Sequence, residues 1–178
     1  MLKKILALAA IIAVLFVALV ETRPSKFHIT RSATISTPPA AVFAQVNDLH
    51  NWQAWSPWAK LDQQAKNTYE GPRAGTGAIF RWAGNKNVGE GSMTIIQSRP
   101  SDLIRMKLEF LKPFKATNTT EFTFIPEGNQ TVVTWSMFGK SNFMGKAMSL
   151  IMNCDKMAGG QFEQGLAQIK SIVEEKLR

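Results

Sequence analysis

The chain begins with one long apolar run and continues with shorter, alternating patterns. Ile5 to Val20 is uninterrupted apolar sequence, preceded by Lys3 and Lys4 and followed by polar residues. A run of this length predicts a helix. Residues 25–178 contain no repeat and no low-complexity linker, and we expect them to form one domain after the N-terminal segment 1–24.

Apolar residues recur at every second position through much of this domain, which is the period of a β-strand with one buried face. The clearest case sets four apolar residues against three charged ones: Ile104, Met106, Leu108 and Phe110 against Arg105, Lys107 and Glu109. Short turn sequences between the runs favour an antiparallel meander. The predicted strands cover residues 27–35, 76–83, 88–98, 103–111, 117–126 and 130–138, with a short one near Tyr69.

Helical patterns flank these strands. A short helix is predicted after Thr37-Pro38-Pro39, and a second short turn of helix at 51–54. Apolar residues return at helical spacing from Phe143 to Leu177, which predicts a long amphipathic helix. Because glycine weakens a helix interior, we expect a break or kink at Gly159-Gly160.

The order of these elements accompanies a set of recognisable motifs. They are Pro38-Pro39-Ala40-Ala41-Val42-Phe43, residues 47–58 (NDLHNWQAWSPW), Tyr69-Glu70-Gly71-Pro72, Gly75-Thr76-Gly77-Ala78, Trp82-Ala83-Gly84-Asn85, Val88-Gly89-Glu90-Gly91, Thr131-Val132-Val133-Thr134-Trp135, Asp155-Lys156-Met157 and Phe162-Glu163-Gln164-Gly165-Leu166. Together they resemble the START-like (SRPBCC) superfamily, and within it the bacterial polyketide cyclase/dehydrase-like family of membrane-anchored proteins. The resemblance covers nearly the whole chain after the apolar segment.

The resemblance implies an α+β helix-grip fold, in which a curved antiparallel sheet wraps around a long C-terminal helix. It also implies an internal cavity between sheet and helix that binds a hydrophobic small molecule or a lipid. Two alternatives remain: a cyclase, dehydratase or hydrolase acting on a bound apolar substrate, and a membrane-proximal interaction module. A fold alone does not decide among them.

Aromatic and methionine side chains on the apolar faces are the candidate cavity lining. Methionine is flexible and polarisable, which suits a variable apolar ligand. The same residues would equally fill a solid core, and the tryptophans that follow the first helix would equally pack a helix-to-sheet corner. The candidates are Trp55, Trp58, Phe80, Trp82, Met93, Phe110, Phe122, Trp135, Met137, Met148 and Met152.

Candidates for catalysis are few. His50 lies two residues after Asp48, so Asp48 would orient it as a base, although such loop residues commonly cap or solvate the chain. Glu90 is a third candidate, because a carboxylate inside an apolar cavity has a raised pKa and exchanges protons near neutral pH. Asp155 and Glu163 raise the same question, although Asp155 and Lys156 more simply form a solvated face or a surface ion pair.

Composition narrows the possible partners. The net charge is +8, but the lysines and arginines are scattered, without the basic run or helix expected of a nucleic-acid reader. We therefore expect no nucleic-acid partner. Cys154 is the single cysteine, and no Cys/His grouping has metal-ligand spacing, so neither a disulfide, a metal nor another cofactor is expected.

The N-terminal run fits a membrane anchor or a signal peptide. A cleavage site should have small residues, whereas this segment ends Ala18-Leu19-Val20-Glu21, which favours an uncleaved anchor. The positive charges before the run place the N-terminus in the cytoplasm and the domain on the extracytoplasmic, periplasmic side. Secretion to the periplasm after cleavage is the alternative.

Overall fold

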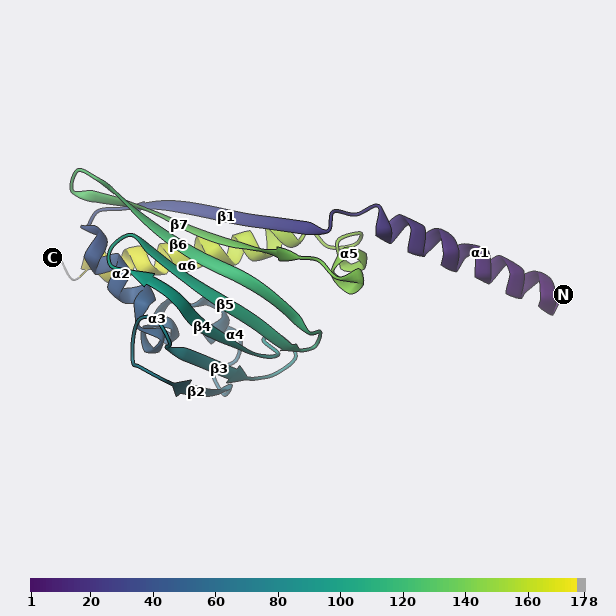
Figure 1. Ribbon diagram of the computed structural model, residues 1–178, viewed down its shortest axis with the longest axis horizontal. Helices are drawn as coiled ribbons and strands as arrows, with labels where there is room; N and C mark the ends of the chain where they lie inside the picture. Colours follow the sequence, from purple (N-terminus) through teal and green to yellow (C-terminus); the bar gives the residue numbers. More distant parts are fainter. Residues whose placement is uncertain (176–178) are drawn as a thin grey trace.

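The alternating runs form one seven-stranded antiparallel sheet in the computed structural model, which describes residues 1–175. Its strands lie in the order β1-β7-β6-β5-β4-β3-β2 (Figure 1). The first and last strands, β1 and β7, are neighbours, and the chain crosses from one edge of the sheet to the other between β1 and β2. The sheet confirms the predicted meander and the α+β helix-grip fold. The strands are β1 (Lys26–Ile35), β2 (Lys66–Glu70), β3 (Ile79–Ala83), β4 (Glu90–Arg99), β5 (Leu103–Lys112), β6 (Ala116–Glu127) and β7 (Gln130–Lys140).

The long helix α6 (Cys154–Glu175) crosses one face of this sheet. The short helices that follow β1 contact α6. Its apolar stripe, Phe162, Leu166, Ile169 and Val173, is buried at helical spacing. The remaining helices are α1 (Leu2–Glu21), α2 (Pro39–Asn47), the 3-10 turn η1 (Leu49–Asn51), α3 (Trp52–Trp55), α4 (Pro57–Leu61) and α5 (Phe143–Met148).

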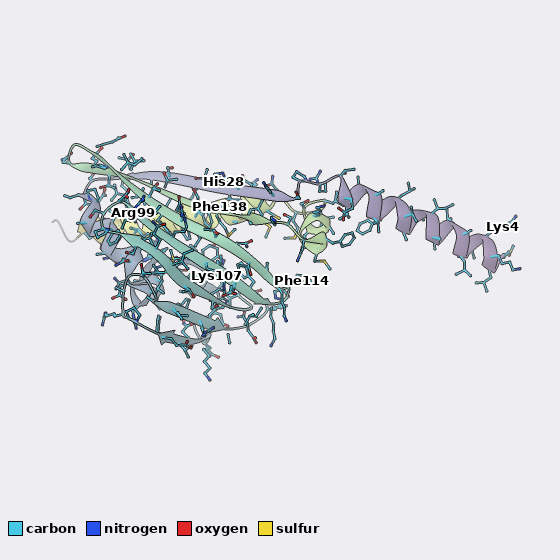
Figure 2. All side chains as sticks on the ribbon, in the orientation of Figure 1. Lys4, His28, Arg99, Lys107, Phe114 and Phe138 are labelled. Carbon is cyan, nitrogen blue, oxygen red and sulfur yellow. The ribbon has the colours of Figure 1, made fainter. Side chains whose placement is uncertain are left out.

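The two faces of the sheet differ as the alternation predicted. On β5, Ile104 and Met106 are fully buried, whereas Lys107, the next residue along the strand, is exposed (Figure 2). Phe122 on β6 pairs with Ile104 on one side and with Trp135 on the other. Aromatic and aliphatic side chains from successive strands therefore meet on the face that α6 covers.

The predicted break at Gly159-Gly160 is wrong. α6 runs through both glycines without interruption, and the chain leaves the helical path earlier, between α5 and α6 at residues 149–153. Gly159 serves packing instead, because a Cβ atom at this position would overlap the guanidinium of Arg31 on β1. The predicted end of this helix at Leu177 lies outside the described residues.

Helix α1 extends away from the sheet and contacts the short helix α5 (Figure 1). Lys146 Nζ lies 2.6 Å from Glu21 Oε2, and Arg23 Nη2 donates to the Ser149 carbonyl at 3.2 Å. Val20 is fully buried at this contact end of α1. The helix is long and apolar enough to cross a membrane, a property that signal sequences near an N-terminus share.

Candidate ligand cavity

A cavity of about 640 Å³ lies between the sheet and α6. This volume falls within the range of about 300–1,000 Å³ that is usual for small-molecule sites. Strands β2 to β7 supply one wall, and helices α3 to α6 supply the other. The buried side chains of its lining are Trp52, Ser56, Phe80, Met93, Leu108, Thr120, Trp135 and Phe162.

Most of the predicted lining residues come together in this cavity: Trp58, Phe80, Trp82, Met93, Phe110, Trp135, Met137, Met148 and Met152. Trp55 and Phe122 do not reach it and lie in the core behind Trp135, at ring-centroid distances of 5.7 and 4.7 Å. For these two residues the solid-core alternative holds. Both are fully buried.

Other lining residues were missed from the sequence, although their patterns contained a signal. Leu108 lies on the same alternating face as Phe110, and Phe162 lies on the apolar stripe of α6. Trp52 also lines the cavity, and its indole N–H donates to the Val46 carbonyl at 2.9 Å. Periodicity placed each of them on the correct face but did not separate lining from core.

Trp135 forms the inner wall and is held from several sides. Its Nε1 donates to Thr120 Oγ1 at 2.9 Å, and that hydroxyl donates onward to the Ser136 carbonyl at 3.0 Å. Its ring stacks on Phe162 with a centroid distance of 4.2 Å and an interplanar angle of 9°. Because the indole N–H is already satisfied, Trp135 presents its apolar ring to the cavity.

Trp82 forms a second part of the wall, nearer the open end. A Cβ atom at position 91 would overlap its ring, so Gly91 on the neighbouring strand allows the indole to lie flat against the sheet. Its Nε1 donates to the Val88 carbonyl at 3.1 Å. The ring stacks with Phe80 and meets Phe110 edge-on.

The ionisable residues of the lining, Asp62, Lys86, Lys112 and Cys154, are partly or fully exposed. They gather at one end, the mouth, which we define as the β3–β4 turn, the β5–β6 turn and the α5–α6 connection. Asp62 Oδ2 accepts the Asn85 N–H at 2.7 Å, which fixes the β3–β4 turn. The cavity therefore combines a hydrocarbon and aromatic interior with a charged mouth.

Glu90, one of the three catalytic candidates, belongs to this end of the sheet. It begins β4, and its Oε1 lies 2.6 Å from Nζ of Lys112 on β5. Lys112 lines the cavity, whereas Glu90 is not among the lining residues. The structure therefore gives Glu90 the role of an ion-pair partner that orients a mouth lysine.

The other two candidates, His50 and Asp48, form the predicted hydrogen bond but lie outside the cavity. His50 Nδ1 is 2.9 Å from Asp48 Oδ1, and Arg73 Nε donates to Asp48 Oδ2 at 2.8 Å. Desolvation is the largest influence on the Asp48 pKa and raises it, but the hydrogen bonds from Arg73 and His50 together lower the pKa below its ordinary value. The carboxylate is thus held charged.

His50 and Arg73, but not Asp48, line a separate hollow of about 290 Å³ beside the β2–β3 turn. His50 stacks on Tyr69 there, with ring centroids 4.0 Å apart. Desolvation raises the pKa of Tyr69. Asp48 pairs with Ala74 in an isolated β-bridge, so this cluster ties the helix–loop segment to the sheet at the end opposite the mouth.

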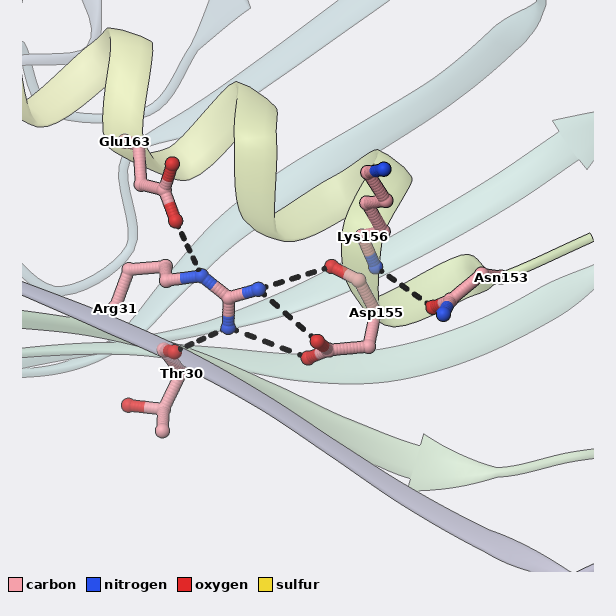
Figure 3. Close-up of polar contacts among 6 residues, drawn as sticks. All are labelled: Thr30, Arg31, Asn153, Asp155, Lys156 and Glu163. Carbon is pink, nitrogen blue, oxygen red and sulfur yellow. Dashed lines mark hydrogen bonds and ion pairs between the residues drawn. The ribbon is translucent and has the colours of Figure 1, made fainter.

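Arg31 on β1 holds the first turns of α6, close to the mouth (Figure 3). Its Nη2 lies 3.0 Å from Asp155 Oδ2 and its Nε lies 2.7 Å from Glu163 Oε1. The hydrogen bond from Arg31 lowers the pKa of Asp155. Asp155 and Glu163 are thus exposed ion-pair partners of Arg31, whereas the sequence had suggested Lys156 as the partner of Asp155.

Comparison with known families identifies the family of this chain. The family model described as polyketide cyclase / dehydrase and lipid transport matches residues 26–174. The chain belongs to this family. No curated protein matches the chain by sequence. Within residues 1–175, no three His, Cys, Asp or Glu side chains are grouped closely enough to hold a metal ion.

Solved structures share the fold of this family member at low sequence identity. Protein CV1439 from Chromobacterium violaceum is 15% identical, with a TM-score of 0.59 over 85% of this chain and 98% of the other. Protein MLL2253 from Mesorhizobium loti is 12% identical, with a TM-score of 0.61 over 84% and 98%. The di-domain ARO/CYC BexL from the BE-7585A biosynthetic pathway is 17% identical, with a TM-score of 0.65 over 89% and 53%.

Proposed function

We propose that this family member binds one hydrophobic small molecule or lipid in the cavity between the sheet and α6, close to a membrane. The observation that carries the proposal is the division of the cavity into an apolar, aromatic interior and a charged mouth. An amphiphile with an apolar body and a polar end matches this division. The family description, which includes lipid transport, agrees with it.

The polar groups of the interior support binding of an apolar body. The indole N–H groups of Trp52, Trp82 and Trp135 each donate to a protein acceptor. A ligand in this cavity therefore gains mainly from removing apolar surface from water, at about 25 cal/mol per Å². The methionine side chains Met137, Met148 and Met152 adapt to ligands of different shape.

The enzymatic alternative also has support from the family description, which names cyclases and dehydrases. Such a reaction requires an acid or base beside the reacting atoms of the substrate. The ionisable lining groups Asp62, Lys86, Lys112 and Cys154 gather at the mouth. This arrangement favours recognition of a polar head over chemistry on the buried body, so binding is the function that we propose.

Location at a membrane rests on α1. Its 20 residues extend over about 30 Å, close to the thickness of a hydrocarbon core. We propose that α1 anchors the domain, residues 25–178, to the membrane and that Ile5 to Val20 lie in the bilayer. The flanking charges place the domain on the periplasmic side in this proposal.

The proposal is tested by extracting the native ligand. The chain from residue 25 onward is first checked for cooperative unfolding, then analysed by native mass spectrometry and by solvent extraction. We expect an apolar compound in a ratio of about one per chain, the stoichiometry of a single site. A chain that carries no apolar compound and takes up none from added lipid extracts would contradict the proposal.

A further inference from the structure

The mouth of the cavity lies at the same end of the domain as α1. β1 begins, and β7 ends, at the pair Lys26 and Lys140, directly after α1 and before α5. In the antiparallel sheet, the β5–β6 and β3–β4 turns fall at this same end (Figure 1). Figure 2 shows Phe114 at this end and Arg99 at the far end. The cavity therefore opens towards the end from which α1 emerges.

Large apolar side chains around the mouth are exposed. Phe114 in the β5–β6 turn is 49% exposed, and Ile151 in the α5–α6 connection is 79% exposed. Full burial of one large apolar side chain gives a favourable free energy of about 1.5–3 kcal/mol, which these side chains do not gain while they are in water. Grouped exposed apolar residues mark an interaction surface. The apolar rim consists of Leu111, Phe114, Phe143, Met144, Ile151 and Met157.

Basic residues surround this apolar rim. Within the described part of the chain, several exposed lysines at this end have no carboxylate partner. Each lysine close to an anionic membrane surface adds about 1 kcal/mol of attraction. An apolar centre with a positive surround is complementary to an anionic bilayer, which offers hydrocarbon beneath negative headgroups. The basic collar consists of Lys26, Lys86, Lys115, Lys140 and Lys156.

Contacts between α1 and α5 fix the position of the apolar rim along the axis of α1. Glu21 and Arg23, at the end of α1 and just after it, bind Lys146 on α5 and Ser149 after it. Val20 is buried at the same junction. A bilayer that contains α1 therefore has its surface at the level of α5, beside the apolar rim.

From this geometry we propose that the apolar rim inserts into an anionic bilayer and that the cavity mouth docks on the lipid surface. A ligand then passes between cavity and bilayer without crossing water. This inference rests on the proposed function, since a docked mouth serves a ligand that dissolves in the bilayer. Phe114 and Ile151 are the inserting residues, and the basic collar supplies the attraction to headgroups.

Insertion is tested with the full chain reconstituted in phosphatidylcholine vesicles, with or without phosphatidylglycerol. In a Cys154→Ser background, Phe114→Cys and Ile125→Cys each carry a polarity-sensitive fluorophore. Ile125 is the matched control, because it is 54% exposed against 49% for Phe114 and lies near the far end of β6. Lipids with brominated acyl chains report contact with hydrocarbon by quenching.

We expect quenching at position 114 and none at position 125. Quenching at position 114 should rise with phosphatidylglycerol and fall with added salt, because the collar acts through screened charges. Equal quenching at the two positions overturns the inference. So does a label at position 114 that remains in water or is covered by a protein instead of lipid.

Ligand exchange separates this inference from the proposed function. A fluorescent fatty acid is loaded into the full chain, and its transfer to acceptor vesicles is followed. Phe114→Ser with Ile151→Ser should slow transfer by more than about tenfold, because two rim side chains no longer insert, and should leave equilibrium affinity unchanged. Ile125→Ser is the control.

The outcomes are distinguishable. Normal binding with unchanged transfer in the rim variant overturns the docking inference and leaves the proposed function standing. A wild-type chain that binds no fatty acid or other lipid contradicts the proposed function, and the quenching comparison still decides whether the rim inserts.

Discussion

Arg31 occupies the space that a side chain at position 159 would need. A Cβ atom on Gly159 would overlap the guanidinium, which bridges Asp155 and Glu163 (Figure 3). The glycine therefore allows β1 to approach the first turns of α6 and to hold the helix beside the mouth. At Gly160, by contrast, a Cβ atom would meet nothing within 4 Å.

The two adjacent glycines predict opposite effects of the same substitution. Gly159→Ala should displace the guanidinium of Arg31, which weakens its ion pairs with Asp155 and Glu163 and slightly lowers the urea midpoint of unfolding. Gly160→Ala should be neutral or stabilising by up to about 1 kcal/mol, because alanine is the better helix former. Urea denaturation of both variants measures the difference. Equal effects at the two positions would show that Arg31 does not constrain position 159.

The Arg31 ion pairs should make stability depend on pH in the acid range. The pKa of Asp155 is lowered in the folded state, so its stabilisation is complete above the unfolded value of about 3.9. It is lost as the pH falls below that value and through the lower folded pKa. In Arg31→Gln the gap in urea midpoint from wild type should be constant above about pH 5 and close below about pH 4. A gap that stays constant to the lowest pH would contradict this assignment.

Cavity residues should affect binding more than outer-face residues. Trp82→Ala should weaken binding of a fluorescent fatty acid by about 1 kcal/mol, or roughly fivefold, through loss of an aromatic contact. Lys107→Ala, on the exposed face of β5, should have no effect. Trp135→Ala should also weaken binding but costs about 3–5 kcal/mol of stability, so the variants are compared at equal folded fractions. Equal affinities would place the ligand elsewhere.

The charged mouth predicts a preference for an anionic head. Lys86 lines the mouth and is exposed without a carboxylate partner in the described part of the chain. A fatty acid should therefore bind more tightly than the alcohol of the same chain length, by the 0.2–1 kcal/mol or about 1.4- to fivefold typical of exposed pairs. Lys86→Gln should remove much of this difference in a competition assay. A preference that persists in Lys86→Gln would assign the head to another group.

Local patterns predicted the fold well. The alternation at Ile104 and Met106 identified the buried face of β5, because strand periodicity follows from backbone geometry alone. The pairing of His50 with Asp48 was predicted as well. The location of this pair outside the cavity was not predicted, because it depends on which end of the sheet the loop contacts.

Features that depend on long-range contacts escaped the sequence. Phe122 and Phe110 alternate in the same way on neighbouring strands, yet Phe122 lies in the core and Phe110 lines the cavity. Gly159 suggested a broken helix because the partner that requires a glycine, Arg31, comes from a strand far away in the sequence. The α5–α6 break was likewise not predicted.

The ligand is expected to lie in the space between the sheet and α6. Ala158 lines this space from α6, whereas Ala167 on the same helix is exposed. We would titrate a fluorescent fatty acid into wild type, Ala158→Trp and Ala167→Trp. Ala158→Trp should fill the cavity and lower the affinity by more than about tenfold, or 1.4 kcal/mol, while Ala167→Trp should bind as wild type. Unchanged affinity in a folded Ala158→Trp variant would contradict this location of the ligand.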